Sequence, residues 1–218
     1  MKPLVALLHG LLRSSRSMAR LARALEAEGY DTWLGGYPSQ TLGIEACARR
    51  VAEALAPRAA GRPLFLVTHS MGGILARYIA GEVGEAAGLS VRGVLMLAPP
   101  NAGSRLARRL GGLRVFHRLY GPAGQELGAE AAAWPVPTVP VAVIAGTHPR
   151  GLNPTGWMSQ VTGLIRGDEP SDGTVLVEET RLPGMVDFAT VPASHTFIMD
   201  HPRVREMVLR FLRDGRLG

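Results

Sequence analysis

The chain has 218 residues, of which 46% are hydrophobic, and its formal net charge at neutral pH is +6. This length and composition predict one globular domain with a sizeable core, spanning residues 1–218. No apolar run approaches the roughly 20 residues that a membrane-spanning helix needs. The single cysteine, Cys47, excludes an internal disulfide.

The positive charge comes almost entirely from arginines, which are scattered along the chain. A nucleic-acid-binding protein is expected to cluster its basic residues and interleave them with aromatic ones. Because only 6% of the residues are aromatic, we expect no nucleic-acid partner. Residues 105–119 are denser in arginine and carry an apolar stripe. They predict an ordinary surface helix, which we favour, or a basic amphipathic helix in weak contact with an anionic membrane surface.

Short apolar runs typical of buried strands alternate with segments of helical periodicity. In chain order, the expected strands are Leu4–Leu8, Asp31–Leu34, Leu64–Thr68, Val91–Ala98, Val141–Ala145 and Phe188–Val191. The expected helices are Ser17–Glu28, Leu42–Leu55 (ended by Pro57), Met71–Ile79 and a terminal helix that begins near Pro202. This alternation predicts an α/β fold, in which helices cover both faces of a mostly parallel sheet of about six strands.

The N-terminal apolar run continues directly into His9-Gly10 without the small-residue cleavage site of a secretory signal peptide. We interpret this run as a core strand and expect a cytoplasmic protein. The sequence does not predict an oligomeric state.

A serine lies at the tip of a predicted strand–turn–helix unit. The strand runs up to His69, Ser70 follows, and an amphipathic segment begins at Met71. This is the arrangement of a nucleophile elbow, in which a sharp turn exposes the serine hydroxyl. Gly72 lacks the Cβ that would block the turn. The free N–H groups of the helix N-terminus point toward whatever Ser70 attacks.

Two further polar residues follow later strand ends and complete a catalytic set with Ser70. A serine hydroxyl needs a neighbouring base at neutral pH, and histidine is the usual one. The base in turn needs a carboxylate that orients it. The loop after the fifth strand supplies Asp172, and the loop after the sixth supplies His195. Because the carboxyl ends of parallel strands share one edge, we expect Ser70, Asp172 and His195 to meet there.

The same chemistry needs two backbone N–H groups directed at the developing oxyanion. We expect them from Met71, at the start of the helix after the serine, and from Leu11, in the turn after the first strand. No metal and no organic cofactor is needed.

Other residues could take two of these roles. Asp168 or Glu169 could replace Asp172 if the loop were shifted, and His148 is the alternative base. We assign the remaining histidines to structural roles. His9 is expected to hydrogen-bond the oxyanion turn, His69 to point away from the site because strand residues alternate faces, and His117 and His201 to lie at the surface or at a helix cap.

The segments that carry this chemistry are His9-Gly10-Leu11, Thr68-His69-Ser70-Met71-Gly72-Gly73, Ala98-Pro99-Pro100-Asn101-Ala102-Gly103-Ser104, Ser171-Asp172-Gly173-Thr174-Val175 and Ser194-His195-Thr196. Together they resemble α/β-hydrolase-fold lipases and esterases, small bacterial lipase-like enzymes in particular. The resemblance spans nearly the whole chain and is weakest over Arg105–Pro140. It departs from the family's G-x-S-x-G elbow at Thr68, which stands in place of the first glycine.

The resemblance implies the α/β-hydrolase fold, a Ser-His-Asp triad and hydrolysis of carboxylic esters through an acyl-enzyme. Two alternatives stay open: an acyltransferase or thioesterase with the same triad, and a catalytically silent module that binds a lipid or a protein. Residues 101–140 lie where this fold often inserts a cap or lid. We expect Leu12, Phe116, Trp157 and Met158 to line the pocket for a small-molecule or lipid ester.

Overall fold

The computed structural model describes residues 2–128, 134–148 and 169–218, apart from the side chains of residues 115–117. Within these residues the strands are β1 (Leu4–Leu8), β2 (Asp31–Gly35), β3 (Pro63–His69), β4 (Ser90–Leu97), β5 (Val141–Gly146) and β6 (Asp187–Val191). They form one sheet in the order β2-β1-β3-β4-β5-β6, and every neighbouring pair is parallel. Six strands were expected, and all are present within two residues of their predicted bounds.

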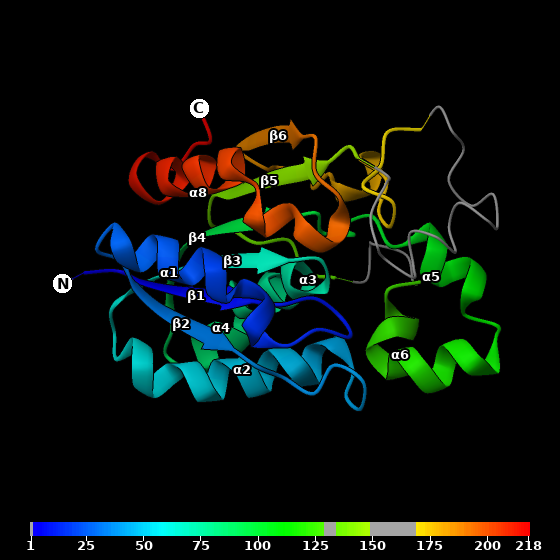
Figure 1. The fold of residues 1–218 in the computed structure, drawn as a ribbon. Coiled ribbons are helices and arrows are strands. Elements are labelled where there is room, and N and C mark those ends of the chain that lie inside the picture. Colours follow the sequence, from blue (N-terminus) through cyan, green and yellow to red (C-terminus); the bar gives the residue numbers. More distant parts are fainter. Residues whose placement is uncertain (1, 129–133, 149–168) are drawn as a thin grey trace.

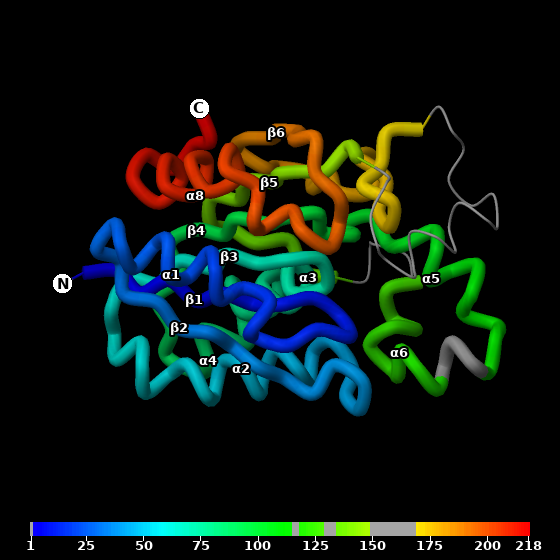
Figure 2. Tube along the Cα trace, viewed as in Figure 1, coloured from blue at the N-terminus to red at the C-terminus, as the bar shows by residue number. Residues whose placement is uncertain are grey.

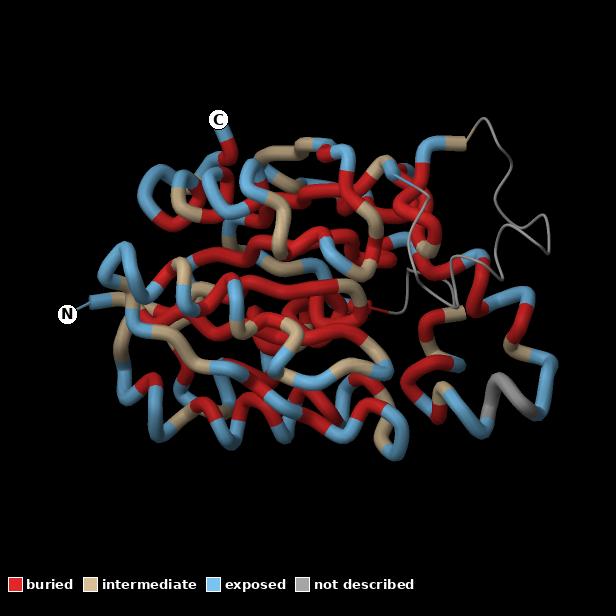
Figure 3. The backbone as a smooth tube through the Cα atoms, in the orientation of Figure 1, coloured by how far each residue is buried: buried red, intermediate tan, exposed pale blue. Residues whose placement is uncertain are grey.

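Helices cover both faces of this sheet (Figure 1). One face packs against α2 (Ile44–Ala59), α3 (Met71–Ile79) and α4 (Glu82–Ala86). The other packs against α1 (Ala19–Ala27), α8 (Pro202–Asp214) and the short 3-10 helix η4 (His195–Asp200). Alternate β1 residues enter the two cores, which is the pattern of a strand buried on both sides. Figure 3 shows the resulting buried strands between helices with exposed outer faces.

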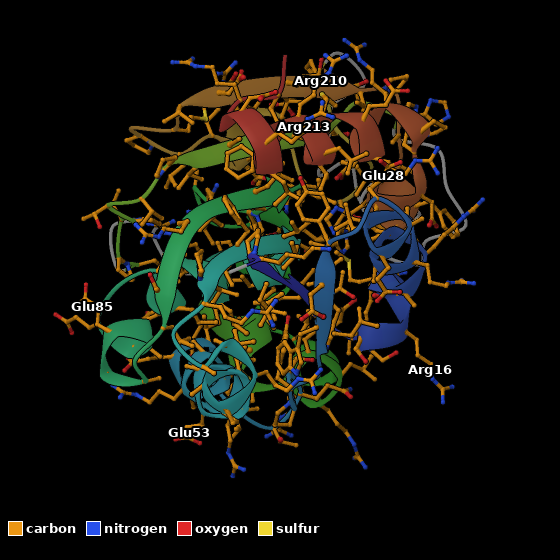
Figure 4. The ribbon with its side chains drawn as sticks, turned by 90° about the vertical axis from the view of Figure 1, so that its left-hand side faces the viewer. Arg16, Glu28, Glu53, Glu85, Arg210 and Arg213 are labelled. Carbon is orange, nitrogen blue, oxygen red and sulfur yellow. The ribbon has the colours of Figure 1, made fainter. Side chains whose placement is uncertain are left out.

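Charged side chains project outward from the helices that surround the sheet. In Figure 4, Glu53 of α2, Glu85 of α4 and Arg16 of η1 (Ser15–Met18) point away from the body of the protein. These charged side chains lie on solvated helix faces.

Two helices, α5 (Arg105–Leu110) and α6 (Arg114–Glu126), lie beyond the carboxyl ends of the strands (Figures 1 and 2). The sequence predicted a single helix over 105–119, but residues 111–113 interrupt it. A further kink falls at Gly121, whose φ is 62°. A Cβ there would lie 1.9 Å from the carbonyl oxygen of Gln40, so only glycine permits this close contact.

Proline also affects α2 less than the sequence indicated. The helix was expected to end at Pro57, but it continues to Ala59 and ends where Ala60 adopts a φ of 43°. Proline removes one backbone donor and does not prevent the following residues from completing the final turn.

Candidate active site

Ser70 occupies the turn between β3 and α3, with φ 53° and ψ −126°. Non-glycine residues rarely adopt this conformation. Two backbone hydrogen bonds hold it: Ser70 N–H donates to the carbonyl of Leu97 at 2.9 Å, and Gly73 N–H donates to that of Ser70 at 2.8 Å. Thr68, beneath the turn, is fully buried. The elbow expected from the sequence is therefore formed, with threonine accommodated in place of glycine.

Glycines allow the elbow to approach the end of β1. A Cβ on Gly72 would lie 2.7 Å from the carbonyl oxygen of His9, and a Cβ on Gly10 would lie 3.0 Å from the Cβ of Ser70. Both distances are shorter than ordinary contacts. The turn after β1 and the turn after β3 consequently pack directly against each other.

His195 and Asp172 lie in a hydrogen-bonded line with Ser70. The His195 Nε2 is 3.1 Å from Ser70 Oγ, and its Nδ1 is 2.7 Å from Asp172 Oδ2. All three residues follow strand ends, as expected. The histidine and the aspartate are 7% and 2% exposed, so this contact is largely shielded from water. The structure therefore brings together the three residues that the sequence analysis selected.

Backbone donors fix the carboxylate of Asp172 in its orientation. Its Oδ1 accepts from the N–H groups of Thr174 and Val175 at 2.9 and 2.8 Å, which leaves Oδ2 for the imidazole. His195 N–H in turn donates to the Asp172 carbonyl at 3.0 Å. Asp172 and His195 are thus joined through both main chain and side chain, and neither side chain can rotate without breaking hydrogen bonds.

Two residues that support the Asp172 loop were not found from the sequence. At the end of β5, a Cβ on Gly146 would lie 2.8 Å from the Cβ of Asp172. The buried Glu179 accepts from Leu176 N–H at 3.0 Å and from Arg105 N–H at 2.6 Å, and so ties the loop to α5. Burial raises the pKa of Glu179, and the two backbone donors oppose that shift. For Gly146, the sequence offered one signal, a glycine directly after the expected strand Val141–Ala145.

The expected oxyanion donors lie in adjacent turns. Leu8 of β1 is paired with Thr68 of β3, and Leu11 and Met71 each follow three residues later. Among the described residues, neither backbone N–H has a hydrogen-bond acceptor. Both therefore remain available to an oxygen atom bound next to Ser70.

His9 forms a hydrogen bond within the turn after β1, the turn that carries Leu11, as the sequence predicted. Its Nδ1 is 2.8 Å from the carbonyl oxygen of Gly10, and its ring stacks on Tyr37 with centroids 4.2 Å apart. The Tyr37 hydroxyl donates to the His9 carbonyl. Burial lowers the pKa of His9, so the ring is neutral at pH 7 and donates through Nδ1.

The expectation that His69 points away from the site is wrong. Its ring lies 4.7 Å from that of His195, and its Nε2 is 2.9 Å from the His195 carbonyl oxygen. Strand alternation is kept: Phe65 and Val67 face the core that contains η4, and His69, two residues later, faces the same side, where His195 begins η4. Burial, followed by the nearby His195, holds the pKa of His69 well below its usual value. It is a neutral donor that supports the His195 main chain.

The alternative acids and bases do not contact Ser70 or His195 where they are described. Glu169 forms an ion pair with Arg105 at 2.9 Å, and His148 is exposed. The side chain of His201 accepts from Arg203 N–H and caps α8. Asp168 and the side chain of His117 lie outside the described residues.

A cavity of about 350 Å³ opens beside Ser70 and His195. Leu11, Leu12 and Arg13 line it from the oxyanion turn, and Leu106, Ala107, Tyr120, Gly124 and Leu127 line it from α5, α6 and the residue after α6. Leu12, expected to be a pocket residue, thus lies on the wall and is 45% exposed. The other expected pocket residues (Trp157, Met158 and the side chain of Phe116) lie outside the described part of the chain.

The described residues include no cluster of histidine, cysteine, aspartate and glutamate that could hold a metal ion. Among the same residues, no helix has the length and apolar character required to cross a bilayer.

The six-stranded parallel sheet, the helices on both of its faces and the turn at Ser70 define an α/β-hydrolase fold. Comparison with solved structures agrees. The mature lipase BlEst2 of Bacillus licheniformis superposes with a TM-score of 0.77 at 21% identity, over 97% of this chain and 92% of its own. The metagenomic carboxyl esterase MGS0156 gives 0.74 at 17% identity, over 97% and 76%. The phospholipase PlaB of Legionella pneumophila gives 0.71 at 19% identity, over 98% of this chain but only 60% of its own.

These neighbours are bacterial lipases and esterases, which is the resemblance that the sequence motifs indicated. No protein-family model and no curated protein sequence matches the chain.

Proposed function

We propose that the protein is a serine hydrolase that cleaves carboxylic esters. The observation that supports this most directly is the continuous hydrogen-bonded line from Asp172 through His195 to Ser70. A serine hydroxyl in such a line loses its proton to the imidazole as it attacks a carbonyl carbon. The lipase and esterase structures with the same fold are consistent with this activity.

In the proposed first step, Ser70 Oγ attacks the ester carbonyl while His195 Nε2 accepts the hydroxyl proton. Asp172 keeps the proton of Nδ1 in place and stabilises the imidazolium that forms. The Leu11 and Met71 N–H groups donate to the tetrahedral oxyanion. The Nε2 proton then passes to the departing alcohol oxygen, which leaves an acyl-enzyme on Ser70.

In the second step, His195 removes a proton from water, and the hydroxide attacks the acyl carbon. Collapse of this intermediate releases the carboxylic acid and returns the proton to Ser70 Oγ. No step requires a metal or an organic cofactor.

We further propose that α5 and α6 form a fixed wall of the acyl pocket within a single domain. Glu179 anchors the start of α5 at Arg105 N–H, and Glu126 near the end of α6 accepts from Ile44 N–H at 2.9 Å. These two anchors join the segment to the acid loop and to α2. The wall is apolar, and it suits the hydrocarbon part of an ester.

Labelling with a fluorophosphonate probe tests the proposal, together with hydrolysis of p-nitrophenyl esters of increasing acyl length. The wild-type protein should label at Ser70, and Ser70→Ala should abolish labelling and lower kcat by about 10⁶. Ser14→Ala, at an exposed serine whose side chain caps nothing, should behave as wild type. Folded wild-type protein that fails to label would instead favour a silent binding module.

The same assay separates hydrolysis from acyl transfer or thioester cleavage. Products formed with an added alcohol acceptor show whether water or the alcohol resolves the acyl-enzyme, and a matched thioester shows the preferred leaving atom. Hydrolysis to the free acid as the main outcome is expected.

A further inference from the structure

Arg13 lies on the wall of the same cavity as Ser70 and His195. It follows the oxyanion turn directly, and its N–H donates to the Gly10 carbonyl at 3.3 Å. Among the described residues that line the cavity, Arg13 is the only arginine, lysine, aspartate or glutamate. The only fixed charge among the described residues that line this cavity is therefore positive.

The guanidinium of Arg13 has no protein partner in the described part of the chain. It makes no hydrogen bond and no ion pair, and its Nε is buried. Arg77 shows what a buried arginine usually has: it donates to the carbonyls of Pro135, Asn101 and Trp134 at 2.6, 3.1 and 2.8 Å. Leaving a partly buried cation without such acceptors costs free energy. A ligand that supplies the acceptors would recover it.

The charged and titratable groups around Arg13 do not replace that ligand. Asp200 attracts the guanidinium, but they form no ion pair within 4 Å, and the Asp200 Oδ1 is itself buried without a partner in the described residues. His201, and not Asp200, caps α8. His9 and His69 are held neutral by burial. The guanidinium stays charged at pH 7.

Arg13, His69 and His195 line the same cavity, and from this we infer that Arg13 lies on the side from which the alcohol departs. Its charge acts on His69, whose ring contacts His195, and on Asp200, at the other end of η4 from His195. The imidazole must reach the departing oxygen to protonate it, so the alcohol portion of an ester lies on this side. The apolar wall of Leu106, Ala107 and Leu127 comes from α5 and the end of α6 and is available to the acyl portion.

Resting on the proposed ester hydrolysis, we propose that Arg13 binds an anionic group on the alcohol portion of the substrate. The substrate class is then a carboxylic ester with an apolar acyl group and an alcohol that bears a carboxylate or a phosphate. Arginine suits both anions, because its planar donors match two oxygens at once. Arg13 would determine specificity through this contact, and the chemical steps would stay with the triad.

A matched pair of aryl esters tests the inference. The first is 4-carboxyphenyl butyrate, and the second is its methyl ester, which has the same shape around the ester but no charge. The ratio of their kcat/KM values, each corrected for the rate of hydroxide hydrolysis, measures the preference for the anion. The wild-type protein should prefer the anionic ester by about tenfold or more, the free energy of one charged hydrogen bond. A third ester, 4-(butyryloxy)phenyl phosphate, shows whether phosphate is preferred to carboxylate.

Variants then assign the preference to Arg13. Arg13→Gln should reduce the ratio about tenfold, and Arg13→Lys should retain part of it. Asp200→Asn removes the carboxylate whose negative charge attracts Arg13. This substitution should increase the ratio, because the guanidinium is then free to attract the substrate anion more strongly. The matched control is Arg16→Gln, at the exposed arginine that projects away from the body of the protein in Figure 4. It should leave the ratio and both rates unchanged.

The outcomes separate this inference from the proposed function. If the wild-type protein labels at Ser70 and hydrolyses both esters at equal corrected rates, or if Arg13→Gln leaves the ratio as it was, the role of Arg13 is overturned and the hydrolase proposal stands. If the folded protein neither labels nor hydrolyses either ester, both fall. A loss of folded protein lowers both rates equally and leaves their ratio unchanged, so thermal unfolding of each variant separates a structural role of Arg13 from a role in selectivity.

Discussion

The strand-end edge that holds Ser70, Asp172 and His195 differs in construction from the wall formed by α5 and α6. At the strand ends, each polar atom is fixed by a backbone partner, as the two N–H donors to Asp172 illustrate. The wall is made of apolar side chains on two helices that are broken and kinked. We infer that the sheet fixes the chemistry, and that the wall is free to vary the substrate.

The exposure of the two regions follows the same division. The triad aspartate is 2% exposed, whereas Leu113 and Leu119 on the outer side of the α5–α6 segment are 54% and 52% exposed. A parallel sheet covered on both faces buries its strand ends, but two helices added beyond that edge have only one covered side. Substitutions at the edge should therefore affect the rate, and substitutions in the wall should affect selectivity.

The largest effect that distinguishes the regions is expected at Asp172. Asp172→Asn keeps the shape of the side chain but presents the imidazole with an amide, which favours the wrong tautomer of His195. The kcat for p-nitrophenyl ester hydrolysis should fall by about 10⁴, with little change in the circular dichroism spectrum.

Glu169→Gln is the matched control for that substitution. Glu169 is in the same loop, but its carboxylate pairs with Arg105, so the loss should be less than about tenfold, the effect of a partly exposed ion pair. A greater loss of kcat at Glu169 than at Asp172 would show that the acid has been assigned to the wrong residue.

Arg77 ties the elbow helix to the segments before α5 and after α6, and its removal should mainly affect stability. It is 2% exposed, and it ties the elbow helix α3 to Asn101 and to Trp134. Burial lowers the pKa of Arg77 to about 10, so it remains charged at pH 7. Arg77→Met leaves buried carbonyls without donors and should lower the free energy of unfolding by about 3 kcal/mol, measured in urea.

Arg58→Met, on the exposed side of α2, serves as the control and should change the free energy of unfolding by less than about 0.5 kcal/mol. Equal effects at the two arginines would mean that the carbonyl contacts of Arg77 contribute no net stability.

The sequence predicts the strand-end residues well for a physical reason. Ser70 and His195 follow short apolar runs closely, and the loop after a third run supplies Asp172, so parallel strands direct all three toward one edge. The His69 side chain could not be placed in this way, because strand alternation gives its face but not which face of the sheet the η4 helix of His195 covers. Arg13 carried no signal, since its unpartnered state depends on what the rest of the fold places around it. The break in α5–α6 was also missed, because its apolar stripe continues across it.

Within the wall, Ala107 offers a test of acyl selectivity. It is buried, lies in α5 and faces the cavity. Ala107→Leu adds three carbon atoms to the space where the acyl group is proposed to bind. The kcat/KM for p-nitrophenyl octanoate should fall at least about tenfold relative to that for the acetate, since excluding two methylenes at about 0.8 kcal/mol each costs about 1.6 kcal/mol.

Arg109→Ala, on the exposed side of the same helix, should leave the acyl-length profile unchanged. An equal loss for acetate and octanoate in Ala107→Leu would place the acyl group elsewhere and remove the distinction between edge and wall.

The smallest expected effect is a pH dependence of stability that belongs to the edge. His69 is neutral in the folded protein because burial lowers its pKa well below 6.5, whereas in the unfolded chain it takes up a proton near that pH. Below about pH 6.5 the unfolded state therefore binds more protons, and the free energy of unfolding falls as the pH falls, by at most about 1.4 kcal/mol per pH unit for this group. Burial of Glu179 acts in the opposite direction, because a raised carboxyl pKa favours the folded state as the pH falls.

His69→Gln removes the titration while its side-chain amide can still donate to the His195 carbonyl. Urea unfolding at pH 7.5 and 5.5 should show that the variant loses about 1 kcal/mol less stability on acidification than the wild type does. His148→Gln, at an exposed histidine, should leave that loss unchanged. If His69→Gln loses as much stability as the wild type does between the two pH values, His69 is not held neutral in the folded protein. The strand-end edge would then be less shielded from water than its contrast with the exposed α5–α6 wall requires.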